Sequence, residues 1–204
     1  MPFSYARDRL ERKHGPRGYE DCDSYKPWLR DEFDYRCIYC LCRETWSANG
    51  QAEFSVDHVL PVSIAPSAAV LYENMVYACS LCNASRQNQH LPFHPGEQPL
   101  AEHLDLTDNG IVTGLTTAGS ELIDRCHLNR TRLVEFRRQM LRMVAYLKAQ
   151  TSNEARALLH ELLRFPTDLP NLRNLKPPAG NARPEGIAES YYERQQRGEL
   201  PDTY

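Results

Sequence analysis

Apolar and polar positions alternate with a period of two in short stretches of this chain and follow a helical period in longer ones. Residues 52–58 ("AEFSVDH") and 74–79 ("NMVYAC") alternate and predict two short strands. Residues 80–89 lack proline and glycine and predict a helix that begins directly after the second strand. The residues between the strands include two prolines and predict a loop. Together these patterns predict a unit of two strands and one helix.

A second group of elements is predicted downstream of this unit. Residues 108–110 read Asp-Asn-Gly between two alternating runs, which is typical of a β-hairpin. Helical patterns follow over about 120–150, with an interruption near Asn129, and over 152–164. Mixed strands and helices in this order predict an α+β fold.

The two ends of the chain have different patterns. Residues 25–33 ("YKPWLRDEF") predict a short helix that carries apolar side chains for the core. From Phe165 onward prolines recur, so we expect an extended or partly disordered tail that allows one short helix over 185–197.

These patterns divide the chain into four segments. We expect a helical lead-in, a strand–strand–helix core, a region of hairpin and basic helices that completes the domain, and a proline-rich tail, over residues 1–36, 37–90, 91–164 and 165–204.

The composition is typical of a soluble globular protein, with 41% hydrophobic and 25% charged residues. The N-terminal residues lack the apolar region of a secretory signal, and no apolar run approaches the ~18 residues of a membrane span. We therefore expect a cytoplasmic protein without membrane association.

The charge is unevenly distributed along the chain. The formal net charge of −3 argues against a uniformly basic nucleic-acid binder. Between Arg125 and Lys148, however, seven positive side chains stand against Glu135 alone. This basic segment is either a solvated helix face or a surface directed at phosphate, and composition does not decide between them.

Four of the seven cysteines form two pairs with a two-residue gap: Cys37, Cys40, Cys79 and Cys82. Two such pairs complete a closed tetrahedral zinc site, whereas the alternative is a set of buried free thiols that pack as small apolar groups. Cys42 lies close enough to Cys40 to replace it as a ligand. Cys22 and Cys126 fit no such pattern, and we interpret them as packing residues.

Polar residues of a different kind lie between the two cysteine pairs. Asp57 and His58 end the first predicted strand, and Asn83 follows a zinc ligand on the predicted helix. Consecutive strand residues point to opposite faces, so we expect the strand to end here and both side chains to reach one cleft facing the helix. A carboxylate and an amide oxygen suit Mg²⁺ or Mn²⁺, and a neutral histidine accepts a proton near pH 7. Alternatively, each residue is an ordinary cap, core or surface residue.

The order of these residues resembles the HNH endonucleases with a zinc-stabilised ββα-metal core, in a pattern that runs Cys37-x2-Cys40 … Asp57-His58-x2-Pro61 … Asn74 … Cys79-x2-Cys82-Asn83-x2-Arg86. The eponymous pattern has histidine where this chain has Asn83, although asparagine also occurs there in the family. The resemblance implies an α+β fold with an HNH core, a hairpin and C-terminal helices.

The resemblance also implies roles for individual residues. His58 would be the general base, Asp57 and Asn83 would bind the catalytic Mg²⁺ or Mn²⁺, and Asn74 would brace the loop beside the histidine. Basic side chains are expected to contact nucleic-acid phosphate, namely Arg86, Arg130, Arg132, Arg137 and Arg138.

The function that follows from the resemblance is metal-dependent hydrolysis of DNA phosphodiester bonds. The segments flanking the core are similar to bacterial stand-alone HNH proteins, some of which serve phage defence or restriction. We expect DNA as partner, with RNA still open, and a protein partner or homodimer that supplies specificity. The alternatives are a non-catalytic zinc-ribbon binding module and an RNA-cleaving nuclease or toxin.

Overall fold

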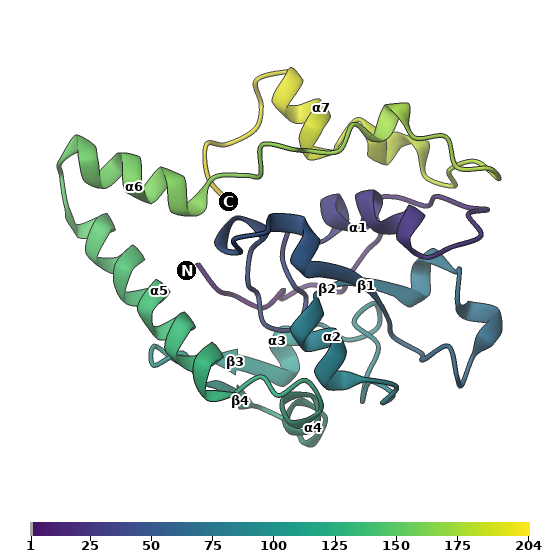
Figure 1. Cartoon of the computed structure of the whole chain (residues 1–204), viewed down its shortest axis with the longest axis horizontal. Coiled ribbons are helices and arrows are strands. Elements are labelled where there is room, and N and C mark those ends of the chain that lie inside the picture. Colours follow the sequence, from purple (N-terminus) through teal and green to yellow (C-terminus); the bar gives the residue numbers. More distant parts are fainter. Residues whose placement is uncertain (1) are drawn as a thin grey trace.

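The computed structural model describes residues 2–204 and has a mixed α+β architecture (Figure 1). The helices are α1 (Lys26–Glu32), α2 (Ser80–Arg86), α3 (Leu100–His103), α4 (Thr117–Arg125), α5 (Thr131–Ala149), α6 (Asn153–Leu163) and α7 (Tyr191–Gln196). The strands are β1 (Phe54–His58), β2 (Met75–Cys79), β3 (Leu104–Leu106) and β4 (Val112–Gly114). Within the described residues, no helix combines the length and the apolar character needed to cross a bilayer.

The predicted strand–strand–helix unit is present at the centre of the molecule (Figure 1). β1 and β2 pair antiparallel, with Phe54 opposite Cys79 and His58 opposite Met75. α2 begins at the residue after β2 and packs back against both strands. It ends at Arg86 because Gln87 adopts a left-handed backbone conformation with a φ of 53°. Asp57 and His58 therefore end β1, Asn74 immediately precedes β2, and Asn83 lies on α2.

The predicted hairpin and the interrupted helix are also confirmed. β3 and β4 pair antiparallel around the predicted Asp-Asn-Gly turn. α4 and α5 are separate helices, and Asn129 lies between them. Its side chain accepts a hydrogen bond from Val112 N (2.9 Å) and donates one to Val112 O (2.8 Å). These hydrogen bonds attach the segment between α4 and α5 to strand β4 of the hairpin.

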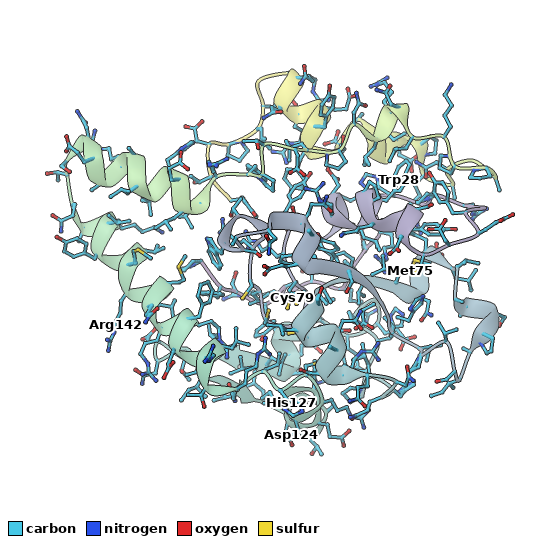
Figure 2. The ribbon with its side chains drawn as sticks, in the orientation of Figure 1. Trp28, Met75, Cys79, Asp124, His127 and Arg142 are labelled. Carbon is cyan, nitrogen blue, oxygen red and sulfur yellow. The ribbon has the colours of Figure 1, made fainter. Side chains whose placement is uncertain are left out.

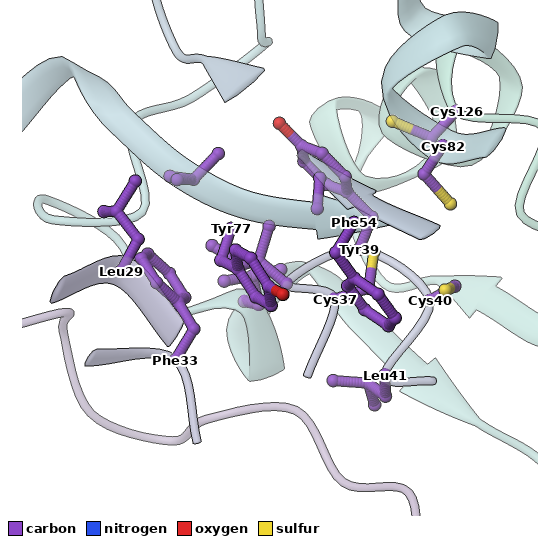
Figure 3. Packing of buried hydrophobic residues seen from close by; sticks show 14 of the residues in the cluster. Leu29, Phe33, Cys37, Tyr39, Cys40, Leu41, Phe54, Tyr77, Cys82 and Cys126 are labelled. Carbon is purple, nitrogen blue, oxygen red and sulfur yellow. The ribbon is translucent and has the colours of Figure 1, made fainter. Parts of the chain in front are cut away.

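The main core lies between α1 and the central sheet. Trp28 and Leu29 of α1 are fully buried, as is Tyr77 of β2. The rings of Phe54 and Tyr77 stack at 5.2 Å between centroids (Figure 3). Complete burial of one large apolar side chain contributes about 1.5–3 kcal/mol, so this layer is a major source of stability.

The proline-rich tail has little regular secondary structure, as expected, but it packs against α1 (Figure 1), so the alternative of a partly disordered tail is wrong. Tyr191 N donates to Asp31 Oδ1 at 2.8 Å, and the other carboxylate oxygen of Asp31 lies 2.8 Å from His14 Nε2. Leu172 is fully buried. The short helix allowed near the end of the chain is α7. Sequence patterning missed the packing because the tail has no strong period of its own.

The docking of the tail yields a testable prediction at Gly186. A Cβ there would lie 1.9 Å from the carbonyl oxygen of Lys13, in the N-terminal segment. Gly186→Ala is expected to lower the free energy of unfolding by about 1–3 kcal/mol in chemical denaturation, because either backbone must move. The control is Glu185→Ala, which removes an exposed side chain of the same turn. Equal stability of the two variants would contradict the observed docking.

Candidate active site and metal centre

The two cysteine pairs meet at one point. The sulfur atoms of Cys37, Cys40, Cys79 and Cys82 lie within 4.8 Å of one another, and the Cys40 and Cys79 sulfurs are 3.7 Å apart. Four thiolates around Zn²⁺ at about 2.3 Å stand about 3.8 Å from each other in a tetrahedron. The cluster therefore fits a closed structural zinc site in both ligand type and spacing.

Local backbone geometry builds each half of this cluster. The turn over residues 37–42, here called the first knuckle, carries Cys37 and Cys40. In it, Cys37 N donates to Cys42 O at 2.9 Å, and Leu41 takes a left-handed conformation that closes the turn. Ile38 N donates to Tyr77 O at 3.0 Å, which anchors the knuckle to β2. Cys42 is thereby part of the turn and is not one of the four cysteines of the group, which removes the ambiguity in the first pair.

The second knuckle spans the junction of β2 and α2. Cys79 ends the strand, and Cys82 lies in the first turn of the helix. Hydrogen bonds from Cys37, Cys40 and Cys82 lower the pKa of the Cys79 thiol, with that from Cys37 the largest. The pKa values of the other three thiols are raised, so zinc binding must displace their protons.

Asp57 is buried between β1 and α2. Its Oδ2 accepts hydrogen bonds from Tyr39 Oη (2.7 Å) and Arg86 Nε (2.9 Å). Its Oδ1 accepts from His58 N at 2.8 Å and from Arg86 Nη2. Burial is the largest single effect and lowers the pKa of Arg86, but the hydrogen bond to Asp57 and the charges of Tyr39, Asp57 and Cys126 together raise that pKa. Asp57 is thus a carboxylate whose charge is balanced inside the protein.

The side chain of His58 contacts a different element. Its Nε2 lies 2.8 Å from the carbonyl oxygen of Ala69, in the loop between β1 and β2. Because a carbonyl only accepts, Nε2 carries the hydrogen, and the neutral ring keeps its lone pair on Nδ1. β1 ends at His58 as expected. The expectation that Asp57 also opens onto a cleft is not met, since its side chain is only 2% exposed.

Asn74 ties together both ends of this loop. Its side chain accepts from Leu60 N at 2.8 Å and donates to Leu60 O (3.0 Å) and Ala68 O (3.1 Å). Ala68 immediately precedes the carbonyl group that holds His58. The asparagine therefore fixes the segment that orients the histidine ring.

Asn83 faces β1 from α2. Its Nδ2 donates to Ser55 Oγ (3.0 Å) and to Val56 O (3.1 Å). Both amide hydrogens point to the strand, which leaves Oδ1 as a free acceptor on a half-exposed residue. Ser55 and Asp57 share the helix-facing side of β1, so the structure brings Asp57 and Asn83 to the same interface.

Comparison with known families identifies the segment that contains all of these residues. Residues 37–89 match the family model described as HNH endonuclease. Residues 37–89 are an HNH domain. No curated protein and no solved structure matches the chain. The HNH domain supports a nuclease that acts on nucleic acid, and nucleases of this family use divalent metals.

The basic residues predicted to contact phosphate are in very different environments. Arg86 and Arg137 are buried, at 2% and 0% exposure, so neither reaches nucleic acid in this structure. Arg130 is half-buried, with its Nη1 3.8 Å from the sulfur of Cys82. Arg132 is exposed, and Arg138 Nε donates to Asn109 O at 3.2 Å. These residues therefore do not form one continuous surface.

Two site residues were missing from the predicted set. Tyr39 lies within the first zinc knuckle and donates to Asp57, but no spacing rule in the sequence pointed to it. Ser55 accepts a hydrogen bond from Asn83. It precedes Asp57 by two residues on β1, so strand alternation places both side chains on one face of the strand. That spacing is the sequence signal that could have identified Ser55 as a site residue.

The residues at the second metal position fit a divalent cation by type. Asp57 and the free oxygen of Asn83 are hard ligands at one interface. However, Arg86 and Tyr39 already occupy the carboxylate oxygens of Asp57. Arg86 and a cation therefore compete for the same carboxylate.

Removal of one cysteine ligand should release the structural metal. Cys82→Ala is expected to lose bound zinc and to lower the thermal unfolding midpoint, because three thiolates do not close the tetrahedron. Cys126→Ala is the matched control, since it removes a buried cysteine outside the cluster and loses only packing. Zinc is measured by elemental analysis. Equal zinc content in both variants would rule out the four-cysteine site.

The Asp57–Arg86 pair yields a separate stability prediction. Arg86→Leu leaves Asp57 buried without its counter-charge and is expected to cost about 3–5 kcal/mol in the free energy of unfolding. Millimolar Mn²⁺ should raise the unfolding midpoint of this variant more than that of the wild type, because the carboxylate is free to bind it. The control is Arg86→Leu with Asp57→Asn. A Mn²⁺ effect that persists in the double variant would exclude Asp57 as the ligand.

Proposed function

We propose that the HNH domain hydrolyses DNA phosphodiester bonds with His58 as general base. The observation that carries this proposal is the orientation of the His58 ring, which is held through Nε2 by the Ala69 carbonyl. The free Nδ1 is the nitrogen suited to take a proton from an attacking water. Its location at the end of β1, inside the HNH segment, supports this role.

Asp57 and Asn83 are the proposed ligands of a catalytic Mg²⁺ or Mn²⁺. When bound, such an ion supplies charge stabilisation at the phosphoryl and leaving oxygens. Arg86 neutralises Asp57 in the structure and must yield the carboxylate for an ion to be held there. Asn74 and Tyr39 are positioning residues, the first for the loop beside His58 and the second for Asp57.

Nucleic-acid affinity in this proposal comes from the accessible part of the basic segment. Arg132 and Arg142 are exposed on α5, and Figure 2 shows Arg142 on the outer side of that helix. Guanidinium contacts to phosphate add affinity that is independent of base sequence and falls with salt. A single site cleaves one strand at a time, so cutting of a duplex requires a second copy or a second event. A protein partner or homodimer would also supply target specificity.

The setting we propose is cytoplasmic, because thiolate ligands for zinc require reduced cysteines. The likeness of the flanking segments to bacterial stand-alone HNH proteins favours phage defence or restriction.

One observation favours a second function. The carboxylate of Asp57 is fully paired inside the protein, as it would be in a non-catalytic zinc module that binds nucleic acid or protein. In that case the Asp57–Arg86 pair is purely structural, and substitution of His58 has no effect on any reaction.

The test is cleavage of supercoiled plasmid with Mg²⁺ or Mn²⁺. His58→Ala is expected to reduce the rate about 10²–10⁴-fold, the usual contribution of a general base. His90→Ala, an exposed histidine of the loop after α2, serves as the control and should cleave like the wild type. EDTA should stop cleavage, and excess Mg²⁺ should restore it without added zinc.

Parallel reactions on single-stranded DNA and RNA determine the substrate, and the ratio of nicked to linear plasmid determines the mode of cutting. Equal rates for His58→Ala and wild type would reject His58 as the base. Inactivity of the zinc-loaded wild type on all three substrates would favour the binding module.

A further inference from the structure

Arg137 carries a charge that the nuclease proposal does not use. It projects from α5 into the core and is 0% exposed. Its Nη2 donates to Leu128 O, whereas its Nε and Nη1 have no hydrogen-bond partner among the described residues. A buried guanidinium without a counter-charge is strongly unfavourable, so a negative group must lie nearby.

No carboxylate supplies that charge. Within residues 2–204, Arg137 forms no ion pair with aspartate or glutamate. Burial lowers the pKa of Arg137, and the groups that oppose this effect are Tyr5, Cys40, Cys42 and Cys82. Two of these cysteines are ligands of the four-sulfur cluster.

Arg130 approaches the same cluster from the N-terminus of α5. Its Nη1 and Nη2 lie 3.8 and 4.0 Å from the sulfur of Cys82. It also lacks a carboxylate partner in the described part of the chain. Arg137 follows Arg130 by seven residues, about two helical turns, so both side chains leave the same face of α5, and the start of that face contacts the thiols.

The charge of a zinc–thiolate centre matches these two arginines. Zn²⁺ bound by four thiolates has a net charge of about −2, and a buried anion of that size needs compensation. We propose that Arg130 and Arg137 are the counter-charges of the zinc centre, and that they hold zinc and α5 together instead of contacting nucleic-acid phosphate. This inference rests on the proposed zinc site.

The proposal makes zinc binding and the attachment of α5 reciprocal. Loss of the zinc–thiolate centre would leave Arg137 as a buried charge without a counter-charge. Loss of the arginine charge would leave the thiolate centre with an uncompensated negative charge, which weakens zinc binding.

The experiment measures zinc retention against a chromophoric chelator in folded, zinc-loaded protein. Arg130→Met and Arg137→Met are expected to reduce zinc affinity about 10–100-fold, the usual effect of losing an outer-sphere partner. Arg137→Lys should restore part of the loss because it keeps the charge. The matched control is Arg132→Met, an exposed arginine of the same helix, which should retain zinc like the wild type.

A second readout compares the drop in the unfolding midpoint on zinc removal. That drop should be smaller in Arg137→Met than in the wild type, because the variant has no buried charge to leave unpaired. If Arg137→Met does not fold, Arg130→Met decides the question, since its side chain is only half-buried.

The outcomes separate the two proposals. A wild type without bound zinc refutes the zinc site itself. If the wild type binds zinc and Arg130→Met, or both methionine variants, bind it with the same affinity, the counter-charge role is overturned. The zinc site itself is then still supported. Equal losses in Arg132→Met and the two other variants would also overturn it, because the effect would then be one of general surface charge.

Discussion

The convergence of four cysteine thiols at the junction of β2 and α2 is the constraint on which the site depends. The two strands and the seven-residue helix of the unit are too short to be stable alone, and the cluster joins them to the preceding knuckle. The knuckle in turn carries Tyr39, whose hydroxyl reaches Asp57. The four-cysteine cluster is thereby connected through Tyr39 to Asp57 of the candidate active site.

Charge balance inside the protein is the second theme. Asp57 is paired with Arg86, and Arg30 is paired with Glu44 at 2.8 Å. Arg137 is buried and has no carboxylate partner among the described residues. Arg86 and Arg30 are nearly inaccessible to water, and each is explained by a specific carboxylate and not by an electrostatic surface. This distinction separates structural arginines from the exposed arginines of α5 that remain available to phosphate.

The remainder of the chain completes the hydrophobic core to which the central sheet of the HNH domain contributes. α1 covers the central sheet with Trp28 and Leu29, and the C-terminal tail covers α1 in turn. A small ββα unit buries too little apolar surface for independent stability. Segments from both ends of the chain therefore determine how firmly His58 and Asp57 are held, although neither segment contributes a side chain to them.

The sequence by itself determined the short strands, the helix, the hairpin at Asp108–Gly110 and the four cysteines of the cluster. Alternation, turn residues and ligand spacing are local properties, so they can be read along the chain. Only the tertiary structure decided that Arg137 is a core residue, that the tail packs on α1, and that Arg86 occupies the carboxylate of Asp57. Those outcomes depend on which residues, distant in sequence, are buried together. The residue type alone does not specify whether the charge of an arginine lies in water or is buried beside an anion.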